Sequence, residues 1–323
     1  MTATHDSLKL SVYFGENDGL SDPLLDLFAR HRLRTSVLLR GAEGFGSKHR
    51  LHSGRLLTLS EDLPLVALAV DEPERVEQVL PEVEAMAGDG LVTVERADAR
   101  AAHEQAKLTV YCGRHQRASG QPAFVAAVEL LRRHGVAGAT VLLGVDGTVR
   151  GERRRASFLG RNADVPLMIV SVGDGERIAA ALPELRALLD EPLMTVERLT
   201  PDVISPGPDE GWRKLTVYSS EQARSGGRPL HVELVRELRR SGAAGVTCLR
   251  GIWGYHGDHA PHGDRLLSLR RHVPVVTVIV DEARAAGRWL GLVTELTGTR
   301  GLVTSEIVPS ARMVKGNPVP SIE

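Results

Sequence analysis

The 323-residue sequence has only two cysteines, a formal net charge of -1 and no long apolar run. Two cysteines exclude a disulfide-rich scaffold, and the near-neutral charge gives no bulk electrostatic reason to bind nucleic acid or an anionic membrane. No apolar run approaches the roughly 20 residues that span a bilayer, and Met1 to Ser7 lacks the apolar core of a signal peptide. We therefore expect a cytoplasmic globular protein that neither inserts into a membrane nor binds nucleic acid.

Lysine is also scarce, because the 40 basic residues include only five lysines. Arginine usage typical of a GC-rich genome explains the scarcity as a whole. Three of the five lysines nevertheless open one recurring segment, which reads Lys9 to Tyr13, Lys107 to Tyr111 and Lys214 to Tyr218.

A matching closing segment follows each of these openings, ending in Glu95-Arg96, Glu197-Arg198 and Ser305-Glu306. The period of about 100 residues is too long for a solenoid unit of roughly 20 to 50 residues, and it fits a small domain with its own core. The sequence therefore predicts three tandem copies of one domain. The expected boundaries are 8–97, 107–199 and 213–309, with a flexible tail over 310–323.

Within the first copy, alternating and continuous apolar stretches predict strands, and apolar residues at helical spacing predict two helices. The expected strands lie near Leu10 to Phe14, Thr35 to Arg40, Leu63 to Val70 and Leu91 to Glu95, with helices near Leu24 to Leu33 and Glu74 to Ala87. This βαββαβ order predicts an α+β, ferredoxin-like fold, an antiparallel sheet with two helices on one face. The other two copies predict the same elements.

The connection between the second and third strands is where the copies differ. Copies 1 and 3 share arginines, glycines, an aromatic residue and a histidine at matching positions; these are Arg40, Gly41, Gly44, Phe45, His52 and Arg55, and Arg250, Gly251, Gly254, Tyr255, His262 and Arg265. Gly46 of copy 1, at whose place copy 3 has His256, is a further candidate. Copy 2 keeps Gly144 and Gly147, but Leu143 replaces the arginine. A retained polar set in two copies predicts a site that the degenerate loop of the middle copy has lost.

The stretches from Leu39 to Val66 and from Leu249 to Val276 resemble the domain of unknown function 190 family, a branch of the PII-like signalling proteins. The resemblance implies a ferredoxin-like fold, trimeric assembly and a flexible loop after the second strand. It also implies small ligands, often the adenine nucleotides ATP, ADP or AMP, in clefts between neighbouring domains. Some relatives are encoded beside fluoride channels, so a membrane transporter or channel is a candidate partner. No catalytic activity is established for the family.

The turn Gly88-Asp89-Gly90 resembles the phosphate-contacting turn of PII proteins, where glycines let backbone N–H groups approach an anion. Copy 3 offers Arg300 and Gly301 at this place, whereas copy 2 has Asp190-Glu191-Pro192. We therefore expect a regulatory protein that binds a small ligand between domains, with the three domains forming a pseudo-trimer within one chain.

Two other functions are compatible with the loops. Loop histidines, His49, His52, His256, His259 and His262, have spacings that suit a metal ion. Alternatively, His52 or His262 serves as the general base of an enzyme, although no nucleophile motif, P-loop or dinucleotide fold is present.

Overall fold

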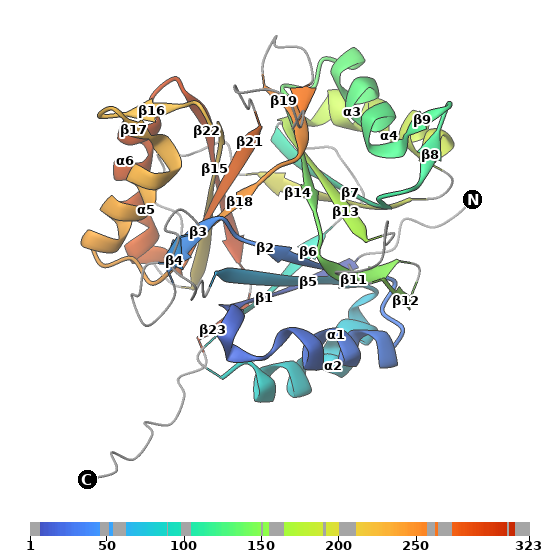
Figure 1. Ribbon diagram of the computed structural model, residues 1–323, viewed down its shortest axis with the longest axis horizontal. Coiled ribbons are helices and arrows are strands. Elements are labelled where there is room, and N and C mark those ends of the chain that lie inside the picture. The colour runs from blue at the N-terminus through green and yellow to red at the C-terminus, as the bar shows by residue number, and fades with distance from the viewer. Residues whose placement is uncertain are drawn as a thin grey trace.

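The computed structural model shows three domains around a common centre, with their sheets facing inward and their helices outside (Figure 1). It describes residues 7–45, 52–53, 63–88, 90–97, 105–149, 151–154, 165–189, 192–199, 211–256, 262–263, 273–308 and 310–313. In this part of the chain no helix is long and apolar enough to cross a membrane.

Each domain has the predicted βαββαβ order. In domain 1 the elements are β1 (Ser7–Gly15), a 3-10 turn (Glu16–Asp18), α1 (Ser21–Arg30), β2 (Thr35–Arg40), β5 (Pro64–Asp71), α2 (Pro73–Met86) and β6 (Leu91–Ala97). In domain 2 they are β7 (Gln105–Gly113), α3 (Ala123–Arg133), β10 (Gly138–Leu143), β13 (Pro166–Asp174), α4 (Gly175–Leu189) and β14 (Leu193–Leu199). In domain 3 they are β15 (Trp212–Ser220), α5 (Leu230–Arg240), β18 (Val246–Arg250), β21 (Pro274–Glu282), α6 (Ala283–Thr297) and β22 (Gly301–Val308).

The first strand lies in the interior of every sheet. In domain 1 the strand order is β2-β5-β1-β6 with antiparallel pairing, which is the ferredoxin-like plan. Small hairpins precede the first helix in the other two domains: β8 (Arg117–Ala118) with β9 (Gln121–Pro122), and β16 (Arg224–Ser225) with β17 (Arg228–Pro229). The predicted fold class is confirmed.

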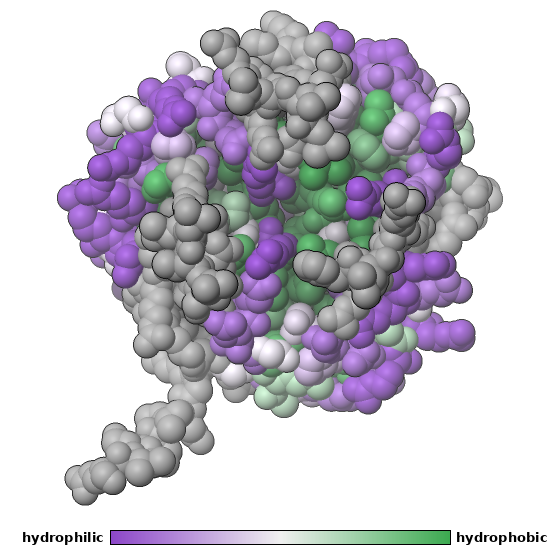
Figure 2. Space-filling view, viewed as in Figure 1, coloured by the Kyte–Doolittle hydropathy of each residue, from purple (hydrophilic) through white to green (hydrophobic). Residues whose placement is uncertain are grey.

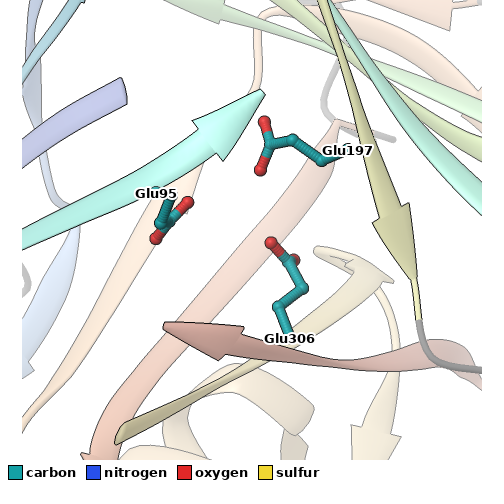
Figure 3. A group of neighbouring side chains, drawn as sticks. All are labelled: Glu95, Glu197 and Glu306. Carbon is teal, nitrogen blue, oxygen red and sulfur yellow. The ribbon is translucent and has the colours of Figure 1, made fainter. Parts of the chain in front are cut away.

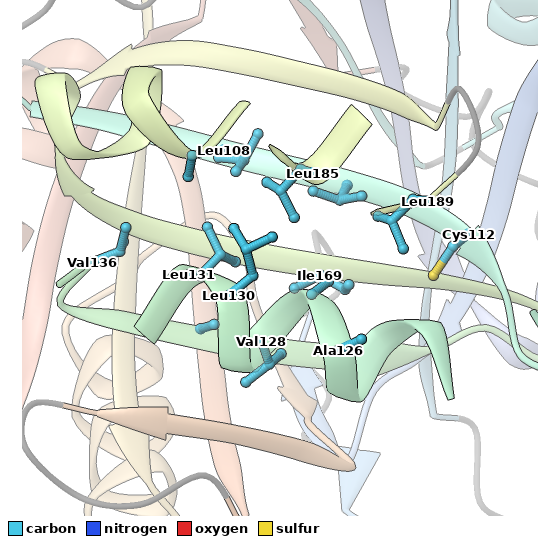
Figure 4. Packing of buried hydrophobic residues seen from close by; sticks show 14 of the residues in the cluster. Leu108, Cys112, Ala126, Val128, Leu130, Leu131, Val136, Ile169, Leu185 and Leu189 are labelled. Carbon is cyan, nitrogen blue, oxygen red and sulfur yellow. The ribbon is translucent and has the colours of Figure 1, made fainter. Parts of the chain in front are cut away.

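The two faces of each sheet have different partners, because side chains alternate along a strand. One face packs under the two helices of its own domain, and Figure 4 shows this core in domain 2 around Leu131, Ile169 and Leu185. The opposite faces of all three sheets meet in a common core that includes Leu39, Leu142, Leu249, Val66, Met168 and Val276. In Figure 2 apolar residues accordingly show near the centre, with polar residues around the rim.

Each domain also lends a hairpin to a neighbour. These hairpins are β3 (Glu43–Phe45) with β4 (His52–Ser53), β11 (Asp146–Val149) with β12 (Glu152–Arg153), and β19 (Trp253–His256) with β20 (His262–Gly263). The strand β3 pairs with β18 of domain 3, β11 pairs with β2 of domain 1, and β19 pairs with β10 of domain 2. The exchange is cyclic, so every domain gives one hairpin and receives one.

The chain end corrects one expectation. A flexible tail was expected from residue 310, but β23 (Ser310–Met313) pairs antiparallel with β6 of domain 1. The outer edge of β6 offers unpaired backbone groups that an extended segment satisfies, even one with few apolar side chains. Residues 314–323 lie outside the described part of the chain.

Candidate functional site

A ring of six buried charges lies where the three sheets meet. Each first strand contributes a lysine, and each last strand contributes the glutamate opposite it in register: Lys9 with Glu95, Lys107 with Glu197, and Lys214 with Glu306. The three carboxylates point toward one another (Figure 3). All six residues are at most 6% exposed, so the ring is cut off from water.

Each lysine joins the glutamate of its own domain to that of another. Lys9 Nζ lies 2.6 Å from both Glu95 and Glu197. Lys107 Nζ lies 2.6 Å from Glu197 and also pairs with Glu306. The ring closes through Lys214, whose Nζ is 2.6 Å from Glu95 and 3.1 Å from Glu306. Three positive and three negative charges therefore balance within a closed circuit.

The ring shifts the pKa values of four of its members toward the charged forms: Glu95, Lys107, Glu197 and Lys214. Burial alone would raise the pKa of Glu197, but Lys107 and Lys9 lower it to about 2. Burial would likewise lower the pKa of Lys107, and Glu197 with Glu306 raises it above its ordinary value. For these groups the attraction between neighbours thus exceeds the cost of removing them from water, so they are ionised at neutral pH.

Carboxylate oxygens of Glu95, Glu197 and Glu306 lie within 4.8 Å of one another, close enough to suggest a metal site. The three lysines fill that role electrostatically, since each carboxylate already has two ammonium neighbours. A divalent cation would add charge to a neutral buried cluster at a high desolvation cost. The donor set therefore does not fit a metal ion. The ring instead joins the three domains through buried ion pairs.

The hairpins require glycine where they cross onto the neighbouring sheet. Gly44, Gly147 and Gly254 occupy equivalent places on β3, β11 and β19. A Cβ atom at these positions would lie 2.1–2.3 Å from a carbonyl oxygen of the receiving strand, which no side chain tolerates. These glycines are explained by close approach between domains.

The hairpin of domain 2 is shorter than the other two and is held by a charged clamp. Thr148 pairs with Arg153 across a tight turn, whereas Gly44 pairs with His52 and Gly254 with His262. The Arg153 guanidinium donates to Asp146 of its own hairpin at 2.6 Å and contacts Asp22 and Asp26 of α1 in domain 1. These hydrogen bonds raise the pKa of Arg153 and fix the hairpin on domain 1.

Beneath this clamped hairpin lies a cleft of about 560 Å³, which we call the 1–2 cleft. Domain 1 lines it with residues around the end of α1 and the start of α2; these are Arg32, Arg34, Thr35, Asp71, Glu72 and Arg75. Domain 2 lines it with residues that include Tyr111, Gln116, Gly151, Glu152 and Pro192. Both domains and the exchanged hairpin are needed to form it.

The 1–2 cleft is connected to the centre of the molecule through one side chain. Tyr111 lines both the cleft and a second cavity of about 70 Å³ on the axis. The axial cavity is mostly apolar and is also lined by Tyr13, Tyr218 and the three ring lysines. Burial raises the pKa of Tyr111 well above its ordinary value, so its hydroxyl is protonated and is available as a hydrogen-bond donor.

Comparison with known families explains the repeats. The model of the family DUF190, described as "Uncharacterized ACR, COG1993", matches residues 7–99, 105–200 and 212–310. The chain belongs to this family.

The chain is similar to two proteins that are each about as long as one copy. A UPF0166 protein of Aquifex aeolicus (strain VF5) is 33% identical over 95 residues, which cover 29% of this chain and 88% of the relative. A second UPF0166 protein of that organism is 30% identical over 87 residues, covering 27% of this chain and 90% of the relative. This DUF190 chain therefore contains three copies of a domain that makes up most of the length of each of these relatives.

Solved structures of other families resemble the chain only weakly. An aspartate kinase from Synechocystis is 10% identical with a TM-score of 0.24, and the match covers 94% of this chain and 44% of the kinase. A microcompartment protein from Desulfitobacterium hafniense DCB is 11% identical with a TM-score of 0.20, covering 64% of this chain and 94% of that protein. Scores this low carry no argument about function.

The structure gives the loop arginines of this DUF190 chain a local partner. Arg40 donates to Glu16 at 2.8 Å, and Arg250 donates to Glu221 at 3.1 Å. Copy 2 has Leu143 in place of the arginine, and Arg114 stands where the other copies have glutamate. Copy 2 thus lacks both members of this ion pair, which accounts for the absence of the arginine from its loop. A role for Arg40 and Arg250 in ligand binding stays a prediction.

Other predicted residues hold the hairpins and turns in place. Gly41 and Gly251 donate their N–H groups to Pro64 and Pro274 at 2.7 and 2.8 Å. The Tyr255 ring is buried in domain 2, where its hydroxyl donates to Val136 O at 2.8 Å. Phe45 belongs to β3, where its backbone pairs with Val246 of domain 3.

The described residues of the predicted phosphate turns do not line the 1–2 cleft. Gly88 and Gly90 end α2 and lead into β6, and the Gly90 N–H donates to Ala87 O at 2.7 Å. Arg300 donates to Leu296 O at 2.8 Å, just before Gly301 begins β22. Ligand binding at these turns stays a prediction.

The predicted histidine positions that the structure describes lie on two different hairpins. His52 lies on β4 beside the sheet of domain 3, whereas His256 and His262 lie on β19 and β20 beside the sheet of domain 2. The positions of Gly46, His49, Arg55, Asp89, His259 and Arg265 lie outside the described residues.

The most informative residues were missed by the sequence analysis. The cleft lies against copy 2, where no site was expected, and it is lined by Arg32, Arg34 and Arg75. One signal in the sequence could have indicated the cleft: Arg32 follows the first helix of copy 1 at the place where the other two copies have Gly135 and Gly242. A second signal was the lysine in each opening segment and the glutamate in the closing segment of the same copy, which indicated the buried charge ring.

Proposed function

We propose that this chain is a regulatory protein that senses a small ligand, with an adenine nucleotide as the foremost candidate, bound in the 1–2 cleft. The observation that carries the proposal is that two domains and an exchanged hairpin build this cleft jointly. A ligand in such a place contacts two domains and the exchanged hairpin at once.

The dimensions and lining of the cleft support a small ligand. Its volume of about 560 Å³ falls in the range of small-molecule sites, which is about 300–1,000 Å³, and sites of this kind occur preferentially at domain interfaces. Three arginines and the first turn of α2 attract an anionic group locally, although the lining as a whole also holds the carboxylates of Asp71, Glu72 and Glu152. Pro166, Leu189 and Leu193 supply apolar surface. A nucleotide combines both kinds of group.

The hairpin over the cleft offers a route from ligand to partner. Gly151 and Glu152 form one wall, and the next residue, Arg153, clamps the hairpin to α1. A ligand that contacts this wall favours the conformation in which the hairpin is docked, so it changes the surface presented to a partner. That the partner is a protein such as a membrane transporter or channel stays a prediction from the family resemblance.

Isothermal titration of the purified chain with ATP, ADP, AMP and cyclic AMP tests the proposal, with GTP as the control for the base. We expect saturable binding of at least one adenine nucleotide. A ligand present at 100 times its Kd stabilises the folded state by about 2.7 kcal/mol, so the thermal unfolding midpoint rises in parallel. No heat and no thermal shift with any adenine nucleotide would refute the nucleotide proposal.

A further inference from the structure

The three inter-domain positions equivalent to the 1–2 cleft differ sharply in charge. In domain 1 the receiving side carries Arg32, Arg34, Thr35 and Arg75. The equivalent residues are Gly135, Ala137, Gly138 and Arg177 in domain 2, and Gly242, Ala244, Gly245 and Ala285 in domain 3. The equivalence is structural, because Arg32, Gly135 and Gly242 all follow the first helix and donate to its last turn at 2.9, 2.9 and 3.2 Å.

Arg32 occupies a backbone conformation that suits glycine. Its φ is +51°, close to the +70° and +86° of Gly135 and Gly242. A left-handed conformation is unfavourable for a residue with a Cβ atom, and glycine is the usual residue at this position after a helix. An arginine kept there at a conformational cost indicates that its side chain serves a function.

Two other charged groups of the cleft, Arg75 and Asp71, are already engaged. Arg75 donates to the carbonyl oxygens of His31 and Arg32 at 3.3 and 3.2 Å. Asp71 accepts from the backbone N–H groups of Arg34 and Glu72, each at 2.8 Å.

The acidic group of the hairpin is engaged as well, since Glu152 pairs with Arg154 at 2.6 Å. Within the described part of the chain, the guanidinium groups of Arg32 and Arg34 have no hydrogen-bond or ion-pair partner. Both are exposed at the mouth of the 1–2 cleft.

We infer that the 1–2 cleft holds the phosphate of its ligand on Arg32 and Arg34, and that the chain binds one such ligand rather than three. This inference rests on the proposed function and adds the anchoring residues and the stoichiometry. Guanidinium groups bind phosphate oxygens through paired, charge-assisted hydrogen bonds, and the nearby N-terminus of α2 adds favourable potential. The other two inter-domain positions lack both arginines, so they have no equivalent anchor.

Titration of ATP into wild-type protein and into the Arg32→Gly, Arg34→Ala and Arg224→Ala variants tests the inference. Arg224 is an exposed arginine on β16 that does not line the cleft, and it serves as the control. We expect one site in the wild-type chain, a Kd raised about tenfold or more by either cleft variant, and no change with Arg224→Ala. Arg32→Gly also relieves the left-handed conformation, so its thermal unfolding midpoint should not fall below that of the wild type.

Adenosine separates recognition of phosphate from recognition of the base. Its affinity should be weak and unaffected by Arg32→Gly, because it lacks the group that the arginine binds. Wild-type binding of ATP at two or three sites, or with a Kd unchanged in both cleft variants, would overturn this inference while leaving the proposed function in place. Absence of binding of ATP, ADP, AMP and cyclic AMP to the wild type would overturn both.

Discussion

Replacing one lysine of the axial ring should destabilise the protein far more than replacing an exposed arginine. Lys107 contacts Glu197 at 2.6 Å and also Glu306, and both Lys107 and Glu197 side chains are only 6% exposed. The variant Lys107→Met removes one positive charge and leaves three buried carboxylates facing two lysines. Removing one partner from a buried ion pair costs about 3–5 kcal/mol, because the remaining charge is left without compensation.

The double variant Lys107→Met/Glu197→Leu restores neutrality. The remaining Lys9, Lys214, Glu95 and Glu306 still form a connected set of ion pairs. The double variant should therefore cost less than the sum of the two single variants, by a coupling energy of up to about 3 kcal/mol.

Urea unfolding followed by circular dichroism measures these differences without screening charges as a salt denaturant would. The control is Arg240→Met, which breaks the exposed ion pair with Glu237 on α5 and should cost under about 1 kcal/mol. The reasoning is refuted if Lys107→Met costs no more than the control, or if the two ring substitutions are additive.

Three further outcomes follow from the same contacts. The folded-state pKa of Glu197 is about 2, below its ordinary value, so the stabilisation that its charge provides is present above about pH 4.5 and should be lost as pH falls toward 2. Urea unfolding midpoints measured at a series of acidic pH values test this. Gly147→Ala should cost about 3 kcal/mol or more in thermal unfolding, since its Cβ would lie 2.1 Å from Ser36 O; a loss under 1 kcal/mol would contradict the close approach. Arg153→Ala should release the hairpin of domain 2 from domain 1, so amide hydrogen exchange of residues 146–149 should become faster while that of β13 stays slow. Equal exchange rates at residues 146–149 in the variant and the wild type would argue against the clamp.

The elements of each domain could be predicted from the sequence because their signals are local. Alternation along Leu10 to Phe14 corresponds to β1 within three residues at its start and one at its end, and the continuous apolar run from Leu63 to Val70 corresponds to β5 within one residue at each end. The threefold repetition then indicated that three such domains follow one another. Periodicity alone reveals these features, since each depends on residues close in the chain.

The hairpin exchange could not be predicted in this way. The strands β3, β11 and β19 have three or four residues each, too few to show a period, and their partners lie in another domain. The glycines at 44, 147 and 254 indicated a shaped loop, but only the three-dimensional arrangement shows that they allow contact with a neighbouring strand.

The 1–2 cleft was missed for a related reason. Comparing the copies drew attention to polar residues that two copies share, whereas the cleft is marked by Arg32 and Arg34, which one copy has and the others lack. A residue that differs from its equivalents is as informative as one that is retained. Its meaning depends on knowing which two copies meet at that place.

The cyclic exchange of hairpins within one chain has a consequence for evolution. In a ring of identical subunits, any substitution appears three times around the axis and must suit every position at once. Here the same circular architecture is encoded in a single gene with three separate segments, so one corner can change while the others keep the ring closed. Such a molecule can meet a partner in a single defined orientation, because none of its three corners is interchangeable with another.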